Sequence, residues 1–187
     1  MRRAAALVVV CLLSLAAPAV AGGPDHLVDA SPTADGAAIH RADVQVVRQG
    51  GDTIDAQNVA QANPHDCTGC EGIAVAFQAV IYKGSPSTIA PKNVAAAVNS
   101  NCTRCGAFAY AYQYAVNSDG HLSQDARAQI HAIEDEARQD VDAGLSYPDL
   151  DARLHDLAAR FRAAIDGGLT DPHDRRATER DDQQPPQ

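Results

Sequence analysis

The sequence predicts an α+β protein in which an antiparallel β-sheet, built from two Cys-x-x-Cys hairpin repeats, is packed by a C-terminal antiparallel helix pair. Three observations support this fold class. The segment around Cys67 and Cys70 recurs 35 residues later around Cys102 and Cys105. Both copies alternate bulky and small residues with the period of two that is typical of strands. After Gly120 the apolar residues recur every three or four positions, as they do in helices.

Residues 1–21 have the order of a secretory signal peptide. Two arginines follow Met1, an apolar run extends to Val20, and small residues end at Ala21. The run is shorter than the roughly 20 apolar residues that a transmembrane helix needs. We therefore expect cleavage after Ala21, with an uncleaved membrane anchor as the alternative. The expected location is secreted, either extracellular or in the cell envelope, without stable membrane insertion after cleavage.

The remaining chain has the length and composition of one acidic domain. Asp and Glu number 24 against 15 Lys and Arg, which gives a net charge of −9, and no basic cluster follows the predicted cleavage site. Nucleic acids and anionic lipid surfaces are therefore excluded as expected partners. A protein or a component of the cell envelope is the partner class that remains, and no cofactor is expected.

The domain boundaries follow from changes in composition. The predicted order is a disordered N-terminal segment at 22–41, a single α+β domain at 42–169 and a disordered tail at 170–187. Within the domain lie the repeat units 58–82 and 93–117 and the helix pair 123–168.

Each repeat is interpreted as a strand, a tight turn at the cysteines and a second, longer strand, which together would form a hairpin. The long strands are expected at Ile73–Ile81 and Phe108–Val116, and a further alternating stretch at Ala42–Val47. No helix-length crossover separates the two long strands. Since parallel neighbours need such a crossover, the sheet is predicted to be antiparallel.

The helical segments carry their own start and stop signals. Ser123 can cap the start of the first helix, and Gly144 lies where a residue in the left-handed conformation would end it. Ser146 can cap the second helix, and Gly167–Gly168 is expected to end it. Each helix has one apolar stripe, so the pair is predicted to cover the bulky face of the sheet.

Two sets of side chains on the long strands allow a structural and a functional interpretation. Tyr110, Tyr112 and Tyr114 share one strand face and could form a platform for sugars or peptides, but a core face covered by helices is favoured. Gln78 and Gln113 occupy the opposite face. They could bind a ligand, but hydrogen bonds to backbone or to one another across paired strands are favoured.

The four cysteines after the predicted cleavage site, Cys67, Cys70, Cys102 and Cys105, permit three interpretations. Disulfides are favoured because an exported chain meets an oxidising environment, and closure within each turn or between the turns remains open. Two Cys-x-x-Cys pairs are also a frequent pattern of four-thiolate zinc sites. A thiol-disulfide redox centre is the third interpretation, although a low thiol pKa usually requires a helix N-terminus and both pairs precede strands.

The doubled motif also resembles a known group of proteins. The order Asn-x-Ala-x-Ala, Cys-x-x-Cys, Ala-x-Ala-x-Gln and a helical pair, from Asn58 to Leu169, resembles exported actinobacterial proteins often catalogued as peptide zinc metalloproteases. A protease of that kind needs His-Glu-x-x-His on one helix, and this chain has no such string. His131 and His155 each lie alone on a predicted helix. The resemblance therefore supplies no catalytic residue.

The sequence favours a secreted, non-catalytic structural or interaction module that the cysteines stabilise. A zinc-binding or thiol-disulfide redox protein centred on the same cysteines is the alternative.

Overall fold

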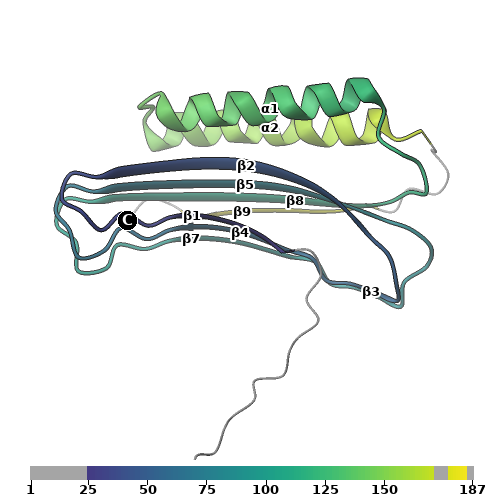
Figure 1. Cartoon of the computed structure of the whole chain (residues 1–187), viewed down its shortest axis with the longest axis horizontal. Helices are drawn as coiled ribbons and strands as arrows, with labels where there is room; N and C mark the ends of the chain where they lie inside the picture. Colours follow the sequence, from purple (N-terminus) through teal and green to yellow (C-terminus); the bar gives the residue numbers. More distant parts are fainter. Residues whose placement is uncertain (1–24, 171–176, 185–187) are drawn as a thin grey trace, which may run out of the picture.

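The computed structural model describes residues 25–170 and 177–184, so the predicted signal peptide lies outside the described residues. Figure 1 shows a layer of two helices above a long sheet, with a second sheet of shorter strands beneath it. The strands in chain order are β1 (His26–Ala30), β2 (Ala38–Gln49), β3 (Thr53–Ile54), β4 (Gln57–Ala62), β5 (Glu71–Tyr82), β6 (Thr88–Ile89), β7 (Lys92–Ala97) and β8 (Gly106–Asn117). The helices α1 (Gln124–Asp142) and α2 (Tyr147–Gly168) and the strand β9 (Ala177–Gln184) follow.

The chain passes repeatedly through the short sheet and the long sheet, and each such pass, called a coil below, pairs with the next in parallel. The short sheet has the order β1-β4-β7 and the long sheet the order β2-β5-β8-β9, while β3 pairs with β6. Glu71 lies opposite Gly106 in the long sheet, and Gln57 lies opposite Lys92 in the short sheet. Both registers equal the 35-residue offset of the sequence repeat. Each repeat is therefore one coil, stacked on the other with equivalent residues side by side.

The predicted antiparallel sheet of hairpins is wrong. The strands on either side of each cysteine turn belong to different sheets and face each other through side chains instead of backbone hydrogen bonds. Residues 83–105 return the chain to the start of the long sheet through β6 and β7, which is a crossover long enough for a parallel pair. In the described part of the chain, β9 is the one antiparallel neighbour in the long sheet.

Two segments predicted to be disordered contain strands. The N-terminal segment 22–41 includes β1 and the start of β2, which together form a first coil without cysteines. The tail 170–187 includes β9, which pairs with β8 at the other end of the stack. In each case the polar composition indicated disorder, but hydrogen bonding to a neighbouring strand stabilises the segment.

The two faces of the long strands carry side chains of different size, and this difference organises the layers. The inward face presents alanines such as Ala74, Ala76 and Ala109, which pack against Ala60 and Ala62 of the short sheet. Alanine side chains are small, so the two sheets can lie close together. The outward face carries the bulky residues of β5 and β8, which form the main core with the helices.

The helices cover this bulky face, as predicted. The apolar stripes of α1 and α2 join one core cluster with the long strands, and the ring of Phe161 lies 5.8 Å from that of Phe77. Ser123 and Ser146 cap the two helices through their side chains, which confirms both predicted starts. The second helix continues through Gly168, where an added Cβ would lie 2.1 Å from the Cβ of Ala126. Neither described helix is long and apolar enough to cross a membrane.

Amide side chains form ladders along the stack. Gln113 Nε2 donates to Gln78 Oε1 at 2.6 Å, and Gln78 Nε2 donates to Gln45 Oε1 at 2.7 Å. This confirms the structural interpretation of the two predicted glutamines. Such side-chain hydrogen bonds satisfy buried polar groups and also fix the register, because a one-residue slip would separate the partners.

A second ladder runs through the short sheet. Asn58 is fully buried, and its Nδ2, with two hydrogens to donate, lies 2.8–3.0 Å from the acceptors Ala76 O, Tyr112 O and Asn93 Oδ1. Because two of these acceptors lie on β5 and β8, the asparagine ties the short sheet to the long one.

Replacing an inward alanine with a larger residue should separate the two sheets. We expect Ala109→Leu to lower the free energy of unfolding by about 1 to 3 kcal/mol, because the close-packed layer has no space for the added carbons. Ala96 lies on the outer face of β7, so Ala96→Leu should change stability by less than about 0.5 kcal/mol. Urea unfolding of both variants measures the difference, and equal midpoints would contradict this account of the layers.

The Asn58→Asp variant tests the ladder without changing side-chain size. An aspartate oxygen would face three acceptors, so the variant should lose on the order of 3 kcal/mol at neutral pH. The introduced carboxyl would be protonated more easily than usual, and part of the loss should be recovered as the pH falls below about 5. Asn117→Asp, at a position with one exposed amide hydrogen bond to Gly84 O, is the matched control. Thermal unfolding of both variants from pH 7 to pH 4 provides the measurement.

Candidate functional site

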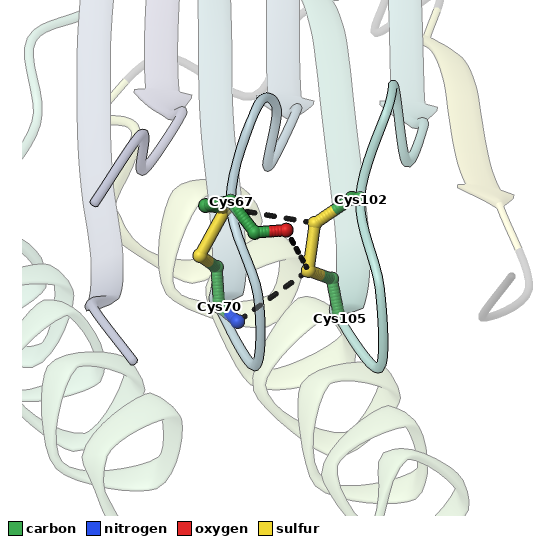
Figure 2. Close-up of side chains that lie close together, drawn as sticks. All are labelled: Cys67, Cys70, Cys102 and Cys105. Carbon is green, nitrogen blue, oxygen red and sulfur yellow. Dashed lines mark hydrogen bonds between the residues drawn. A yellow bond between two sulfur atoms is a disulfide. The ribbon is translucent and has the colours of Figure 1, made fainter. Parts of the chain in front are cut away.

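The predicted site residues lie in the turns that connect the short sheet to the long one. Cys67 and Cys70 occupy the turn from β4 to β5, and Cys102 and Cys105 occupy the turn from β7 to β8. Figure 2 shows these two turns side by side at one end of the strands, with their sulfur atoms between them. The stacking of coils thus brings together two pairs that are separated by 35 residues in the sequence.

Each turn bends sharply through two residues in the left-handed region. Asp66 (φ 54°) and Asn101 (φ 49°) occupy the first of these positions, and Gly69 (φ 67°) and Arg104 (φ 56°) occupy the second. Asp, Asn and Gly adopt this conformation more readily than other residues. In addition, Asn101 Nδ2 donates to Asp66 Oδ1 at 2.7 Å, so the side chains at the first position also hold the two turns together.

Backbone hydrogen bonds continue the stacking through the turns. The amide of Gly69 donates to Thr103 O at 2.8 Å, and the amide of Thr103 donates to Cys67 O at 3.2 Å. The cysteines of the two turns are therefore held in register by the backbone as well as by the flanking strands.

Each cysteine pair is closed within its own turn. Cys67 is bonded to Cys70 and Cys102 to Cys105, with Cα–Cα distances of 6.3 and 6.0 Å. Both values lie within the 4.4–6.8 Å range of protein disulfides. The closure is local, which is one of the two connectivities that the sequence left open.

The two pairs also contact each other. Cys67 Sγ lies 3.5 Å from Cys102 Sγ, and the four sulfur atoms all lie within 4.8 Å of one another. Within the described residues, this is the one group of three or more His, Cys, Asp and Glu side chains whose ligand atoms come close enough to hold a metal ion.

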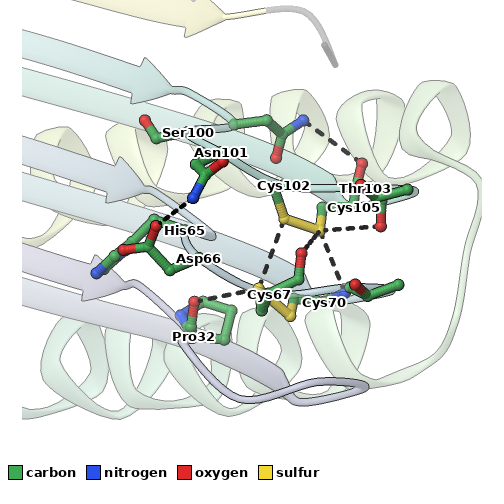
Figure 3. The surroundings of a disulfide bond; sticks show 12 residues. Pro32, His65, Asp66, Cys67, Cys70, Ser100, Asn101, Cys102, Thr103 and Cys105 are labelled. Atoms are coloured by element: carbon green, nitrogen blue, oxygen red, sulfur yellow. Dashed lines mark hydrogen bonds between the residues drawn. A yellow bond between two sulfur atoms is a disulfide. The ribbon is translucent and has the colours of Figure 1, made fainter.

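The surroundings of the sulfur atoms consist mostly of carbonyl oxygens. Cys70 Sγ lies 3.1 Å from Ala34 O. Figure 3 shows Cys67 Sγ 3.8 Å from Pro32 O, and Cys105 Sγ in contact with the carbonyls of Cys67 and Thr103. The backbone amide of Cys70 donates toward Cys105 Sγ at 3.4 Å. Carbonyl oxygens destabilise a nearby negative charge, so the site suits neutral sulfur better than the thiolates that metal binding and redox attack require.

The predicted tyrosines belong to the core. Tyr110, Tyr112 and Tyr114 are at most 2% exposed, and their hydroxyls donate to Asp181, Glu179 and Asp166 respectively. Burial, followed by the neighbouring carboxylates, raises the pKa of each phenol well above its usual range. The stripe is therefore the core face that the sequence favoured.

The two helix histidines pair with different carboxylates. His131 pairs with Glu134 on its own helix at 3.5 Å, while His155 pairs with Asp151 at 3.5 Å and with Asp181 of β9 at 3.0 Å. The structure brings neither of them to the cysteines, since the close ligand group contains cysteines alone.

One polar cluster was missed by the sequence interpretation. His26 is 5% exposed, and its ring nitrogens lie 2.8 Å from Asn58 Oδ1 and 2.9 Å from Asp43 Oδ2. Because Asn58 uses its Nδ2 as a donor, its Oδ1 is an acceptor, so both ring nitrogens of His26 face acceptor oxygens. Arg138 joins the cluster at 3.3 Å from Asp43 Oδ1. His26 occupies the register position of Asn58, which no local pattern in the sequence reveals.

Comparisons with known proteins do not indicate a function for this chain, so the function is inferred from the geometry of the site. No protein-family model matches the chain, and neither the curated proteins nor the solved structures gave a match. The resemblance to exported actinobacterial proteins therefore stays a prediction from the motifs.

The two disulfides should differ in their accessibility to reductant. Cys67 and Cys70 are 6% and 1% exposed beneath the first coil, whereas Cys102 and Cys105 are partly exposed. We expect a phosphine reductant to open the Cys102–Cys105 bond at least about tenfold faster, because access controls the rate of attack. Alkylation after short reduction, followed by peptide mass spectrometry, measures both rates. In denaturant the rates should converge, and equal rates in the folded protein would contradict the burial argument.

Proposed function

We propose that the chain is a secreted, non-catalytic module, structural or interaction-bearing, whose stack of coils is stabilised by two disulfides. The observation that carries the proposal is the closure of each cysteine pair within its own turn at disulfide distance. Such closure suits an oxidising compartment, which agrees with the secretory pattern of residues 1–21.

The roles of the other polar side chains support a scaffold. The glutamines that could have bound a ligand form hydrogen bonds between coils, as the buried asparagines do. The tyrosines that could have formed a binding platform lie in the core beneath the helices. These groups stabilise the fold, and any partner would then bind the outer surface of the module.

The state of the cysteines in the exported protein tests the proposal. The protein would be collected from an exporting host into a thiol-alkylating buffer and measured by intact mass and thiol titration. We expect no titratable thiol and a mass four hydrogens below that of the reduced chain. In the loop-entropy view each local closure contributes about 2 kcal/mol, so the Cys102→Ser, Cys105→Ser double variant should unfold at lower temperature.

A metal site on the same four cysteines is the second candidate, and the convergence of their sulfur atoms within 4.8 Å favours it. Tetrahedral thiolate coordination would use all four sulfurs. The carbonyl oxygens around them argue against it, because they oppose the negative charge that thiolate ligands carry. Four titratable thiols together with stoichiometric zinc in the exported protein would overturn the disulfide scaffold in favour of this candidate.

A further inference from the structure

A hollow of about 380 Å³ lies between β2 and α1, at the end of the strands opposite to the cysteine turns. Its floor is apolar and consists of Val44, Val46, Ile81, Leu122 and Ile130. Figure 1 shows the helices over the long sheet that contains β2. Val44 and Val46 of β2 pack against the core beneath the helices, yet both remain partly exposed. The volume falls within the range of about 300 to 1,000 Å³ that is usual for small-molecule sites.

The rim of this hollow is rich in basic groups, although the chain as a whole is acidic. Arg48, Arg127, His121 and His131 line it, against the single carboxylate of Glu134. That carboxylate is already within ion-pair distance of Arg138 and His131. The hollow therefore combines an apolar floor with an excess of positive charge.

Arg48 of β2 and Arg127 of α1 differ from the other arginines of the two helices. Arg138, Arg153, Arg160 and Arg162 all pair with Asp or Glu side chains. Across the described residues, neither Arg48 nor Arg127 forms such a pair. In a chain with a net charge of −9, these two arginines line one hollow and have no carboxylate partner in the part of the chain that the structure describes, so both can bind an anion.

Both guanidinium groups are nevertheless held in place. Arg48 Nη2 donates to Gly120 O, and Arg127 Nη2 donates to Leu122 O at 2.7 Å. A guanidinium has five donors, so each arginine keeps donors for a ligand after these contacts. Because the loop carbonyls fix the side chains beforehand, less entropy is lost when an anion binds.

We propose that this hollow binds a medium-chain fatty-acid anion, with the alkyl chain on the apolar floor and the carboxylate at Arg48 and Arg127. The apolar floor disfavours a purely inorganic anion, and the arginines favour a charged head over a neutral one. The inference goes beyond the scaffold proposal and does not depend on the state of the cysteines.

Octanoate and 1-octanol provide a matched pair of probes for the oxidised, full mature chain. By isothermal titration calorimetry we expect 1:1 saturable binding of octanoate, and binding of 1-octanol weaker by at least about tenfold, since the alcohol cannot form charge-assisted hydrogen bonds with the arginines. In ¹⁵N–¹H spectra the amides of Val46 and Ile130 should shift on titration. Absence of saturable octanoate binding, or equal affinity for the alcohol, would overturn the proposal.

Variants at the rim locate the carboxylate. The Arg48→Gln, Arg127→Gln double variant should bind octanoate at least about tenfold more weakly. Arg104→Gln removes an arginine from the cysteine turn at the far end of the strands, which also has no carboxylate partner within the described residues. This variant should bind octanoate within about twofold of the natural chain. If octanoate affinity fell equally in both variants, the loss would reflect net charge alone, and the proposed site would be rejected.

A floor variant and a fold measurement complete the test. Val46→Asp places a carboxylate on the partly exposed floor and should abolish octanoate binding without removing a fully buried side chain. Thermal unfolding of each variant verifies that the fold is retained. If the double arginine variant does not fold, the Arg127→Gln single variant replaces it, and unchanged affinity in that variant would contradict the assigned carboxylate position.

Discussion

The structure depends on the in-register stacking of like residues between successive coils. Asn58 lies beside Asn93, Gln78 beside Gln113, and Cys67 is held beside Cys102 in the same way. A parallel stack satisfies the backbone of each strand with its neighbours, while the amide ladders satisfy the buried side chains that a slipped register would leave unpaired. The sheets, the cysteine turns and the sulfur cluster all follow from this one register.

The contrast between small and large side chains on the long strands explains the layers around that stack. Alanines on the inner face allow the short sheet to approach, and the bulky outer face requires the helices as a cover. At the edge of this cover, next to β2, the helices leave a hollow whose basic rim differs from the acidic remainder of the chain. The same arrangement therefore accounts for both the rigid interior and the proposed ligand site.

The two ends of the stack are protected in different ways. The last coil pairs with the antiparallel strand β9, whose Glu179 and Asp181 receive hydrogen bonds from core tyrosines. The first coil lacks cysteines, and its inward positions carry polar groups, including His26 and Asp43. Inward charges blunt an open sheet edge against pairing with other chains. Arg138 reinforces this effect, since its Nε donates to the backbone carbonyl of Ala42 on the edge strand.

Much of the fold could be predicted from local patterns. Alternation located the long strands, helical periodicity and caps located both helices, and the apolar stripes predicted that the helices cover the sheet. The four cysteines were identified as the candidate site because the repeat brings two pairs into equivalent positions. Strand direction could not be derived in this way, because a hairpin and two strands facing each other across two sheets show the same alternation. The tertiary structure alone decided between them, since small inward side chains such as Ala76 stabilise the second arrangement only when another sheet is present to pack on them. The first coil, the strand β9 and the His26 cluster likewise depend on partners distant in sequence, whose contacts no local pattern records.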